Sequence, residues 1–187
     1  MKVSIITVCY NSESTILKTI ESVFQQSYNN IEYIIVDGSS KDKTLNIINE
    51  FSKNSKIDIK VISEVDNGIY DAMNKGVALS SGNIIGFVHS DDYLADESII
   101  LNIINCFKGN NIDGVYGDIE YVYKNDINRV LRYWKSCDYS YPILRSGWMP
   151  PHPALYLKKS VYKKHGSFDL NLKISSDYDF IIKLFLN

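Results

Sequence analysis

Two adjacent aspartates, which follow a short apolar run, are the residues of this chain best placed to do chemistry. The run is Ile84–Val88, and after it come His89, Ser90, Asp91 and Asp92. A short apolar run behind a turn signal predicts a buried strand. Two carboxylates at the carboxyl end of a strand repel each other and resist desolvation, unless a divalent cation or a helix N-terminus neutralises them. The pair therefore indicates a metal site or, alternatively, a helix cap by Asp92 or Asp96.

Polar residues follow two other apolar runs in the same way. Thr7–Asn11 closes the run Lys2–Val8, and Asp37 closes the run Ile31–Val36. In open α/β sheets, ligands bind outside the carboxyl ends of the strands, where acidic residues accept hydrogen bonds from a base or a ribose. Asp37 is thus a candidate nucleoside contact, and the alternative is a turn aspartate that binds its own backbone.

The segment Glu64–Gly76 is dense in polar side chains. Its residues 66–68 form a turn signal, and Asp71, Asn74 and Lys75 share one helix face at spacings i, i+3 and i+4. Solvated helix faces commonly show this spacing as well. The chain has no GxGxxG or GxxxxGK[ST] loop, which argues against a dinucleotide dehydrogenase or a P-loop enzyme.

The second half of the chain offers two further candidates. His152 lies among the four prolines between Pro142 and Pro153, where it is either a ligand arm or part of a structural crossing. Asp177 opens the last helical segment, followed by Asp179. A carboxylate in a first helical turn either complements the helix dipole or faces a site.

Strands and helices that would position these residues alternate four times before residue 118. An α/β fold with a mostly parallel central sheet and right-handed crossovers follows from that alternation. The expected strands are Lys2–Val8, Ile31–Val36, Ile57–Ser63 and Ile84–Val88. Helices are expected over Glu13–Gln26, from Ser40 or Asp42 to Phe51, over Tyr70–Leu79 and over Ser98–Phe107. Later come a hairpin of Ile119–Tyr123 and Arg129–Trp134, an irregular proline-rich segment, and a helix over Ser176–Leu186.

Length and composition narrow the class of protein. A chain of 187 residues is long enough for one domain with a full core. The net charge is −2 without a basic tract, so no nucleic-acid partner is expected. No stretch approaches the ~18 uninterrupted apolar residues of a membrane span. Three widely spaced cysteines without metal spacing favour a reducing cytoplasm.

Taken together, these segments resemble glycosyltransferase family 2, the inverting sugar-nucleotide transferases of the GT-A fold. The resemblance runs from Val3 to the final helix, nearly the whole chain. The matching segments are Val3–Asn11, Val36–Thr44, Asp66–Gly76, His89–Asp92, Gly166–Asp169 and Asp177–Asp179. It implies a single GT-A domain over residues 1–187, with a Rossmann-like sheet and a small antiparallel, irregular region. Residues 1–118 would form the nucleotide-sugar-binding half, and residues 119–187 the acceptor-side half.

The resemblance also assigns roles to residues. Asp91 would match the last carboxylate of the family's D-x-D element and bind Mg²⁺ or Mn²⁺, with His89 in the first position of that element and His152 as a further ligand. Asp177 would be the catalytic base, with Ser176 in place of the glutamate of the usual E-D pair and Asp179 as a second candidate. The nucleotide-binding residues would be Thr7, Cys9, Tyr10, Asp37, Asp66, Gly68, Asp71, Lys75, Ser90 and Asp91.

The implied activity is transfer of a sugar from a nucleotide-sugar, UDP-linked by preference, to a hydroxyl acceptor with inversion. The acceptor would be a saccharide or a lipid-linked saccharide of cell-surface polysaccharide or glycolipid synthesis. Because related enzymes continue beyond the end of this chain, acceptor contacts and peripheral membrane association at the inner face are expected there. Two rival functions stay open: a nucleotide-sugar-binding module without catalysis, and a sugar nucleotidyltransferase, whose Gly-rich, Arg/Lys-containing phosphate loop is absent here.

Overall fold

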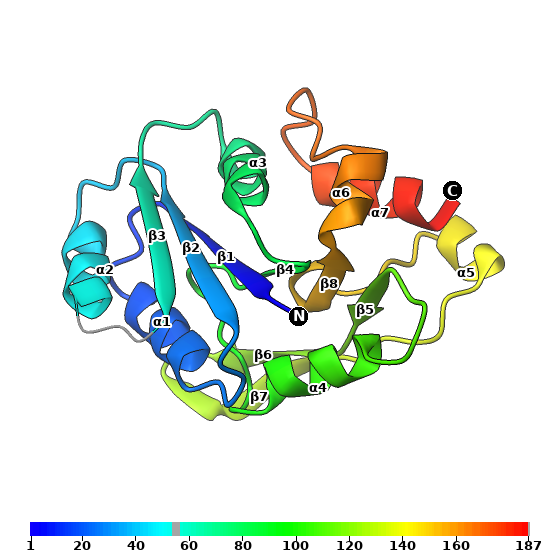
Figure 1. Cartoon of the computed structure of the whole chain (residues 1–187), viewed down its shortest axis with the longest axis horizontal. Helices are drawn as coiled ribbons and strands as arrows, with labels where there is room; N and C mark the ends of the chain where they lie inside the picture. The colour runs from blue at the N-terminus through cyan, green and yellow to red at the C-terminus, as the bar shows by residue number, and fades with distance from the viewer. Residues whose placement is uncertain (54–56, 187) are drawn as a thin grey trace.

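The computed structural model, which describes residues 1–53 and 57–186, is built around a six-stranded sheet (Figure 1). The strands are β1 (Val3–Cys9), β2 (Ile31–Asp37), β3 (Asp58–Ser63), β4 (Ile84–Phe87), β5 (Gly114–Tyr116) and β8 (Leu155–Lys158). Their order is β3-β2-β1-β4-β8-β5. Strands β1 to β4 are parallel, whereas β8 runs antiparallel to both of its neighbours. The predicted mostly parallel sheet is therefore confirmed.

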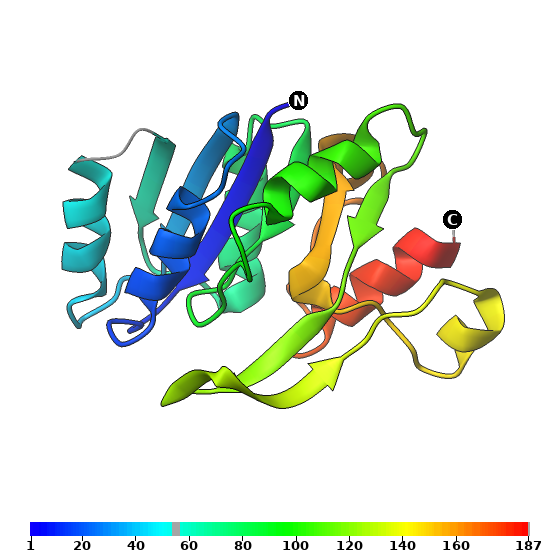
Figure 2. The same cartoon turned by 90° about the horizontal axis from the view of Figure 1, so that it is seen from below.

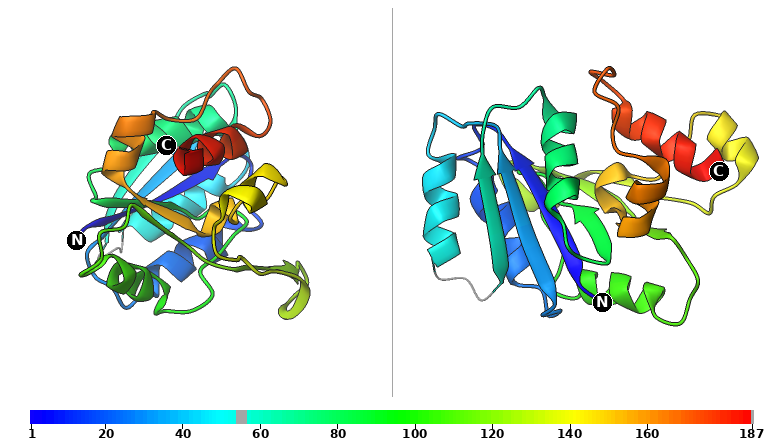
Figure 3. Two further views of the ribbon diagram at one scale, coloured as in Figure 1. Left: turned by 90° about the vertical axis from the view of Figure 1, so that its right-hand side faces the viewer. Right: turned by 45° about the horizontal axis from the view of Figure 1, so that its top comes forward.

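Helices cover both faces of this sheet, so every residue of β1 and β2 is buried (Figures 1 and 3). One face packs against α1 (Ile16–Phe24), α2 (Thr44–Lys53) and α4 (Ile99–Phe107). The other packs against α3 (Ile69–Leu79), α6 (Lys159–His165) and α7 (Ser176–Leu186). The central strands are rich in Val and Ile because both of their faces lie in the core.

A separate two-stranded ribbon extends from the domain and crosses below the carboxyl ends of the parallel strands in Figure 2. It consists of β6 (Ile119–Tyr123) and β7 (Asp126–Trp134), joined by a two-residue turn. Strand β7 begins three residues earlier than the sequence pattern predicts. Its first three residues, Asp126 to Asn128, are all exposed and include a single apolar side chain, Ile127, so no buried face marks them as strand.

Parts of the second half were not predicted. Strands β5 and β8 are three and four residues long, and the proline-rich segment contains a short helix, α5 (Tyr141–Arg145), and a turn of 3₁₀ helix at His152–Ala154. Strand β8 comes from the second half but lies between β4 and β5. The two proposed halves therefore share one sheet. Within residues 1–53 and 57–186, no helix is both long and apolar enough to cross a bilayer.

A buried carboxylate ties four segments together at the amino end of the sheet. Glu32 on β2 is fully buried. It accepts hydrogen bonds from Ser81 Oγ at 2.7 Å and from Gly82 N at 2.8 Å, and it forms an ion pair with Lys60 at 3.1 Å. Burial raises the pKa of this carboxyl, but hydrogen bonds from Ser4, Ser81 and Lys60 together outweigh burial and hold the pKa well below its usual range.

We expect Glu32→Gln to lower the free energy of unfolding at pH 7 by about 1–3 kcal/mol, the cost of disturbing buried hydrogen bonds. Because the folded-state pKa is depressed, this contribution is complete above the unfolded-state pKa of about 4.3 and is lost as the pH falls below it. Urea unfolding at pH 7 and at pH 3.5 measures both effects. The difference between wild type and variant should shrink in acid; a larger difference there would contradict the assignment. Glu50→Gln, on the exposed side of α2, is the matched control.

Candidate active site

The strand order reverses between β1 and β4, since β2 and β3 continue on one side of β1 while β4 lies on the other. Open α/β sheets bind ligands outside the carboxyl ends of the strands at such a switch point. Here the loops after the two strands are joined: Ser12 Oγ and Ser90 Oγ lie 2.9 Å apart. Thr7 is fully buried and donates to the carbonyl of Val88 at 2.6 Å. The side chain of Thr7 thus fixes the switch point from inside the sheet.

Asp37 orders the loop after β2. Its carboxylate is fully buried and accepts hydrogen bonds from Ser40 N at 3.0 Å, Ser63 Oγ at 2.7 Å and Ser40 Oγ, with Cys9 Sγ at 3.7 Å. A carboxylate offers about four acceptor positions, so the chain itself uses them all. Contact with a nucleoside therefore requires one of these donors to turn away. Cys9 is buried too, and burial followed by the charge of Asp37 raises the pKa of its thiol.

Tyr10, Gly38 and Asp66 converge from three different loops. A methyl group placed on Gly38 would lie 2.6 Å from Asp66 Oδ2 and 3.4 Å from Tyr10 Cδ2. The Tyr10 side chain is 58% exposed. Asp66 also accepts a hydrogen bond from Gly68 N at 2.9 Å, and Gly68 has a φ of +108°, which favours glycine there. An open aromatic ring beside a carboxylate is suited to hold a planar, hydrogen-bonding base.

Asp71 and Lys75 brace the loop that bears Asp66. Asp71 accepts a hydrogen bond from Asn67 N at 2.9 Å, and Lys75 pairs with Glu64 at 2.9 Å and with Asp71 at 3.4 Å. Hydrogen bonding and charge from these neighbours raise the pKa of Lys75 and lower that of Asp71. Both side chains lie at the site's edge, and each has partners within the chain.

Two histidines face each other beside the end of β4. The Nε2 atoms of His89 and His152 are 3.4 Å apart, and both rings pack against Phe87. Burial, and then the charge of His89, lower the pKa of His152 to about 4. Burial also lowers the pKa of His89, against the opposing charges of Asp91 and Asp177. Both imidazoles are therefore neutral at pH 7. His152, distant in sequence, thus reaches the same strand end as His89.

The two adjacent aspartates, Asp91 and Asp92, differ in their exposure to solvent. Asp91 is exposed, whereas Asp92 is half-buried. Burial, and then the charge of Asp91, raise the pKa of Asp92 to about 6. The N-cap residue of α4 is Ser98, and no side chain caps this helix, so the expected cap by Asp92 or Asp96 is wrong. Asp96 Oδ1 instead accepts hydrogen bonds from Ser98 N at 2.7 Å and Ser98 Oγ at 2.6 Å in the turn before the helix. Among the residues that the structure describes, none forms a hydrogen bond or an ion pair with the Asp91 side chain, so its carboxylate is available to a ligand.

Asp177 enters the same region from the second half of the chain. It lies in the first turn of α7, is half-buried, and its Oδ1 accepts a hydrogen bond from Tyr70 Oη at 2.8 Å. The Tyr70 ring stacks on Phe168, and Asn74 holds the Phe168 backbone through bonds of 2.8 and 3.0 Å. Asp179 instead pairs with Lys183 at 2.6 Å, one turn further along α7.

Two further signs of function gather in these loops. The described non-glycine residues with positive φ are Asn11, Ser39 and Ser175, which lie after β1, after β2 and before α7. Buried side-chain polar atoms that lack a hydrogen-bond partner in the described part of the chain are His89 Nδ1, Tyr156 Oη and Ser176 Oγ. Strained backbone and unpaired polar atoms cost free energy, and both are concentrated at functional sites.

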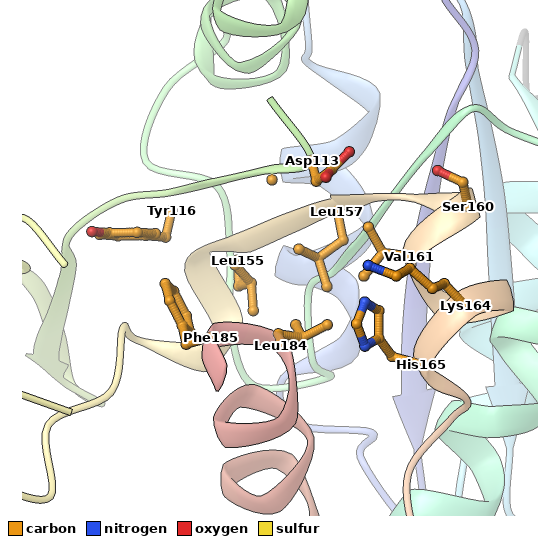
Figure 4. A pocket seen from close by; sticks show the side chains of 11 residues that line it. Asp113, Tyr116, Leu155, Leu157, Ser160, Val161, Lys164, His165, Leu184 and Phe185 are labelled. Carbon is orange, nitrogen blue, oxygen red and sulfur yellow. The ribbon is translucent and has the colours of Figure 1, made fainter. Parts of the chain in front are cut away.

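Two cavities lie on either side of this region. One, of about 440 Å³, is lined mainly by apolar residues of β5, β8, α6 and α7, such as Leu155, Leu157 and Phe185 (Figure 4). None of the predicted site residues lines it. The other, of about 920 Å³, begins at Asp91 and extends under the β6–β7 ribbon. The candidate active site is therefore continuous with the second cavity.

Comparison with known proteins identifies the class. The family model described as "Glycosyl transferase family 2" matches residues 4–168. This chain belongs to that family and is a glycosyltransferase. The resemblance seen in the sequence is thus confirmed.

Individual relatives are consistent with the family. A "PGL/p-HBAD biosynthesis glycosyltransferase" of Mycobacterium bovis is 28% identical, over 98% of this chain and 70% of the relative. The Escherichia coli enzyme "UDP-Glc:alpha-D-GlcNAc-diphosphoundecaprenol beta-1,3-glucosyltransferase WfaP" is 44% identical over 49% of this chain and 36% of the relative.

Solved structures support the fold. S. aureus TarS matches all of this chain with a TM-score of 0.79 and 22% identity, and this chain spans 56% of that structure. A second structure is the mannosyltransferase PcManGT of Pyrobaculum calidifontis in complex with GDP-Man and Mn²⁺. It matches 91% of this chain with a TM-score of 0.70 and 16% identity, and this chain covers 48% of that structure. These two identities are low, so the likeness establishes the GT-A architecture alone.

Sequence reasoning missed Tyr70 and Tyr156 as functional candidates. Tyr70 lies within the recognised segment Asp66–Gly76, yet its partner Asp177 is 107 positions away. Tyr156 sits in a strand that has no local signal. The one available hint was the abundance of tyrosine, 14 in the chain, which is typical of proteins that stack aromatic rings on sugars or bases.

Proposed function

We propose that this domain transfers a sugar from a UDP-linked donor to a hydroxyl acceptor with inversion at the anomeric carbon. The observation that supports this most is the Tyr70–Asp177 hydrogen bond of 2.8 Å. It brings a carboxylate from α7 to the strand edge where Tyr10, Asp66 and Asp91 lie. UDP is favoured because the E. coli relative's name includes UDP-Glc, and one TarS structure, with a TM-score of 0.77, is a complex with UDP-GlcNAc.

The donor's nucleoside would stack on Tyr10, with Asp66 and Asp37 as hydrogen-bond acceptors. Cys9, Gly68 and Ser90 would supply backbone or small side-chain surface close to the ribose and diphosphate. Asp71 and Lys75 would hold the loop from residue 64 to 67 in place, and Lys75 would reach a phosphate when it releases Glu64. Thr7 would act indirectly, through its hydrogen bond to Val88.

A divalent cation is part of the proposal, and the donor atoms at Asp91 fit one. No group of three His, Cys, Asp or Glu side chains in the described part of the chain is placed to hold a metal. Mg²⁺ sites that use substrate phosphates need only one or two protein carboxylates. Asp91 would bind the ion together with the donor's phosphates. His89 and His152, both neutral, would become further ligands only after their rings turn from each other toward Asp91, because the three side chains do not form a metal-holding group as they stand. A bound Mg²⁺ or Mn²⁺ would stabilise the negative charge that develops on the leaving diphosphate.

The chain's own residues would supply the base. An acceptor hydroxyl has a pKa far above 7, so its proton must be accepted as the new bond forms. Asp177 is suited to accept it, because its carboxylate lies in the first turn of α7 and its Oδ1 is held by the Tyr70 hydroxyl at 2.8 Å. Tyr70 would orient that carboxylate through its hydroxyl. With one base and no protein nucleophile, displacement is direct and inverts the anomeric carbon.

A polysaccharide or glycolipid pathway is the proposed setting, with a saccharide or lipid-linked saccharide as acceptor, since the names of the two relatives refer to such products and substrates. The three cysteines are free, which fits a reducing cytoplasm. Association with the inner face of the membrane would depend on the lipid-linked acceptor. A nucleotide-sugar-binding module without catalysis is the alternative, and nucleotide binding without sugar transfer or hydrolysis would favour it.

The nucleoside assignment predicts different results at two nearby aspartates. We expect Asp37→Ala to weaken UDP binding about tenfold or more, because the loop between Tyr10 and Asp66 loses its buried anchor. We expect Asp42→Ala to leave UDP affinity within about twofold and to cost roughly 0.5–2 kcal/mol of stability. Asp42 accepts hydrogen bonds from Thr44 N at 2.9 Å and Glu13 N at 3.0 Å, as a helix cap does.

Calorimetric titration with UDP and thermal unfolding separate the two effects. Asp37→Asn serves as a second variant, since it preserves shape if the alanine variant fails to fold. An Asp37→Asn protein that binds UDP as tightly as wild type would remove Asp37 from the nucleoside site.

A further inference from the structure

The cavity of about 920 Å³ next to Asp91 has walls from three elements. They are the end of β4 with its loop, the helix α4, and the β6–β7 ribbon with the residues that lead into it. Its volume lies within the range of small-molecule sites, about 300–1,000 Å³. The cavity also includes Pro153, which follows His152 directly. It therefore opens beside the atoms that would bind the donor's diphosphate.

Tyrosine rings dominate the cavity wall. Tyr93, Tyr116, Tyr121, Tyr133 and Tyr156 all line it. The Tyr156 ring lies flat over Gly86, where an added methyl group would come within 2.0 Å of the ring, and the side chain is 2% exposed. Its hydroxyl is one of the buried polar atoms that lack a partner within the described residues. An unpaired buried hydroxyl at a cavity is a donor available to a ligand after a small shift.

The charge of the cavity has one sign. Asp91, Asp92, Asp118 and Glu120 line it, and none of the described lining residues is Lys, Arg or His. The Glu120 carboxylate forms no hydrogen bond and no ion pair with the described residues. Its charge acts on Tyr93 and Tyr133 at longer range. Glu120 on the ribbon and Tyr93 in the loop before α4 both line the cavity, and burial, followed by the charge of Glu120, raises the pKa of Tyr93.

The ribbon wall is fixed at its base. The Tyr133 hydroxyl and the backbone and side chain of Ser136 donate hydrogen bonds to Asp118, the latter two at 2.8 and 2.6 Å. Together these hydrogen bonds lower the pKa of Asp118 to about 2. Asp118 is therefore ionised and already paired, and it joins the residue before β6 to β7 and to Ser136 just after β7, so the two ends of the ribbon are held together. Glu120 is left as the ribbon's free acceptor.

We propose that this cavity binds the acceptor of the transfer reaction and selects an uncharged saccharide. The assignment rests on the proposed function, because it places the acceptor beside the donor held at Asp91. Tyrosine rings stack on the apolar faces of a sugar, and the Glu120 carboxylate accepts hydrogen bonds from its hydroxyls. With Asp91 occupied by the cation, the carboxylates of Asp92, Asp118 and Glu120 are left without a basic neighbour among the described residues of the cavity wall and disfavour an anionic sugar or a further phosphate. The phosphate of a lipid-linked acceptor would therefore lie outside the cavity.

Saturation-transfer NMR in the presence of UDP and Mn²⁺ tests the proposal with simple probes. The neutral probes are methyl β-glucoside, methyl β-galactoside and methyl N-acetyl-β-glucosaminide, and the anionic probe is methyl β-glucuronide. At least one neutral glycoside should bind, and about tenfold more tightly than the glucuronide. Tyr121→Ala should weaken that binding about fivefold, and Glu120→Gln about tenfold.

Tyr123→Ala is the matched control. It removes the same ring from the same strand, at 37% exposure against 41% for Tyr121, but Tyr123 does not line the cavity. We expect it to bind like wild type. Three results would each overturn the proposal. In the first, UDP binds but no neutral glycoside does. In the others, the two tyrosine variants have equal effects, or the glucuronide binds as tightly as the neutral glycosides. Failure of UDP itself to bind would instead overturn the donor site. The comparison of Tyr121→Ala with Tyr123→Ala in glycoside binding would then still test whether the cavity binds a saccharide.

Discussion

Asp177→Asn should lower the rate of sugar transfer by ~10²-fold or more, the scale of lost general-base catalysis, while UDP affinity stays within about twofold. The amide keeps the shape of the carboxylate and its place in the first turn of α7, but it cannot accept the acceptor's proton. It also still accepts the hydrogen bond from Tyr70, so the position of the side chain is preserved. A loss in turnover without a loss in nucleotide binding is the signature of a base.

Asp179→Asn is the control for this effect. Asp179 lies on the same helix, and its carboxylate pairs with Lys183 at 2.6 Å rather than with Tyr70. We expect transfer in this variant to be near normal. The assay follows release of UDP from the donor, and NMR of the product reports the anomeric configuration. Retention of configuration, or near-normal turnover of Asp177→Asn, would remove Asp177 from the mechanism and leave Asp179 as the next residue to test.

The second large effect concerns Asp91. We expect UDP to bind at least about tenfold more weakly in EDTA than with Mn²⁺, because its diphosphate brings two or more negative charges to Asp91 and Asp92. In Asp91→Ala, one of these charges and the proposed ligand are both gone. Affinity with Mn²⁺ should therefore fall to the EDTA level, and the difference between the two conditions should disappear.

Isothermal titration with UDP, with and without Mn²⁺, measures this dependence. Asp96→Ala is the control, because Asp96 lies five residues later and holds the turn before α4 through its hydrogen bonds with Ser98. Its loss should cost stability without changing the response to Mn²⁺. Equal affinity of the wild-type protein in Mn²⁺ and in EDTA would exclude the metal role of Asp91.

Much of the donor half was predictable from the sequence. Strands β1, β2 and β4 are runs of apolar residues buried on both faces, and such runs stand out locally. Asp37, Asp66 and Asp91 each follow a strand or precede a helix. Their meeting at one edge follows from parallel pairing. The family motifs supplied the roles proposed for Asp91 and Asp177, which spacing did not give.

The rest depended on contacts between distant segments. Strand β8 exists because Leu155–Lys158 fills the space between β4 and β5, and a four-residue segment has no periodicity to reveal that. The four donors to Asp37 include Ser63 from β3 and Cys9 from β1, so its full burial was not visible in the turn itself. The Tyr70–Asp177 contact likewise joins α3 to α7 across the fold.

The measurement that tests the central claim most directly is native mass spectrometry of this chain with a mixture of UDP-, GDP- and dTDP-sugars. Samples with Mn²⁺ and with EDTA are compared at equal concentrations of each nucleotide-sugar. A UDP-linked donor that binds this domain at a metal-assisted site should give a UDP-sugar adduct in Mn²⁺ that largely disappears in EDTA. No nucleotide-sugar adduct at all, or a GDP- or dTDP-sugar adduct that is indifferent to EDTA, would contradict that account.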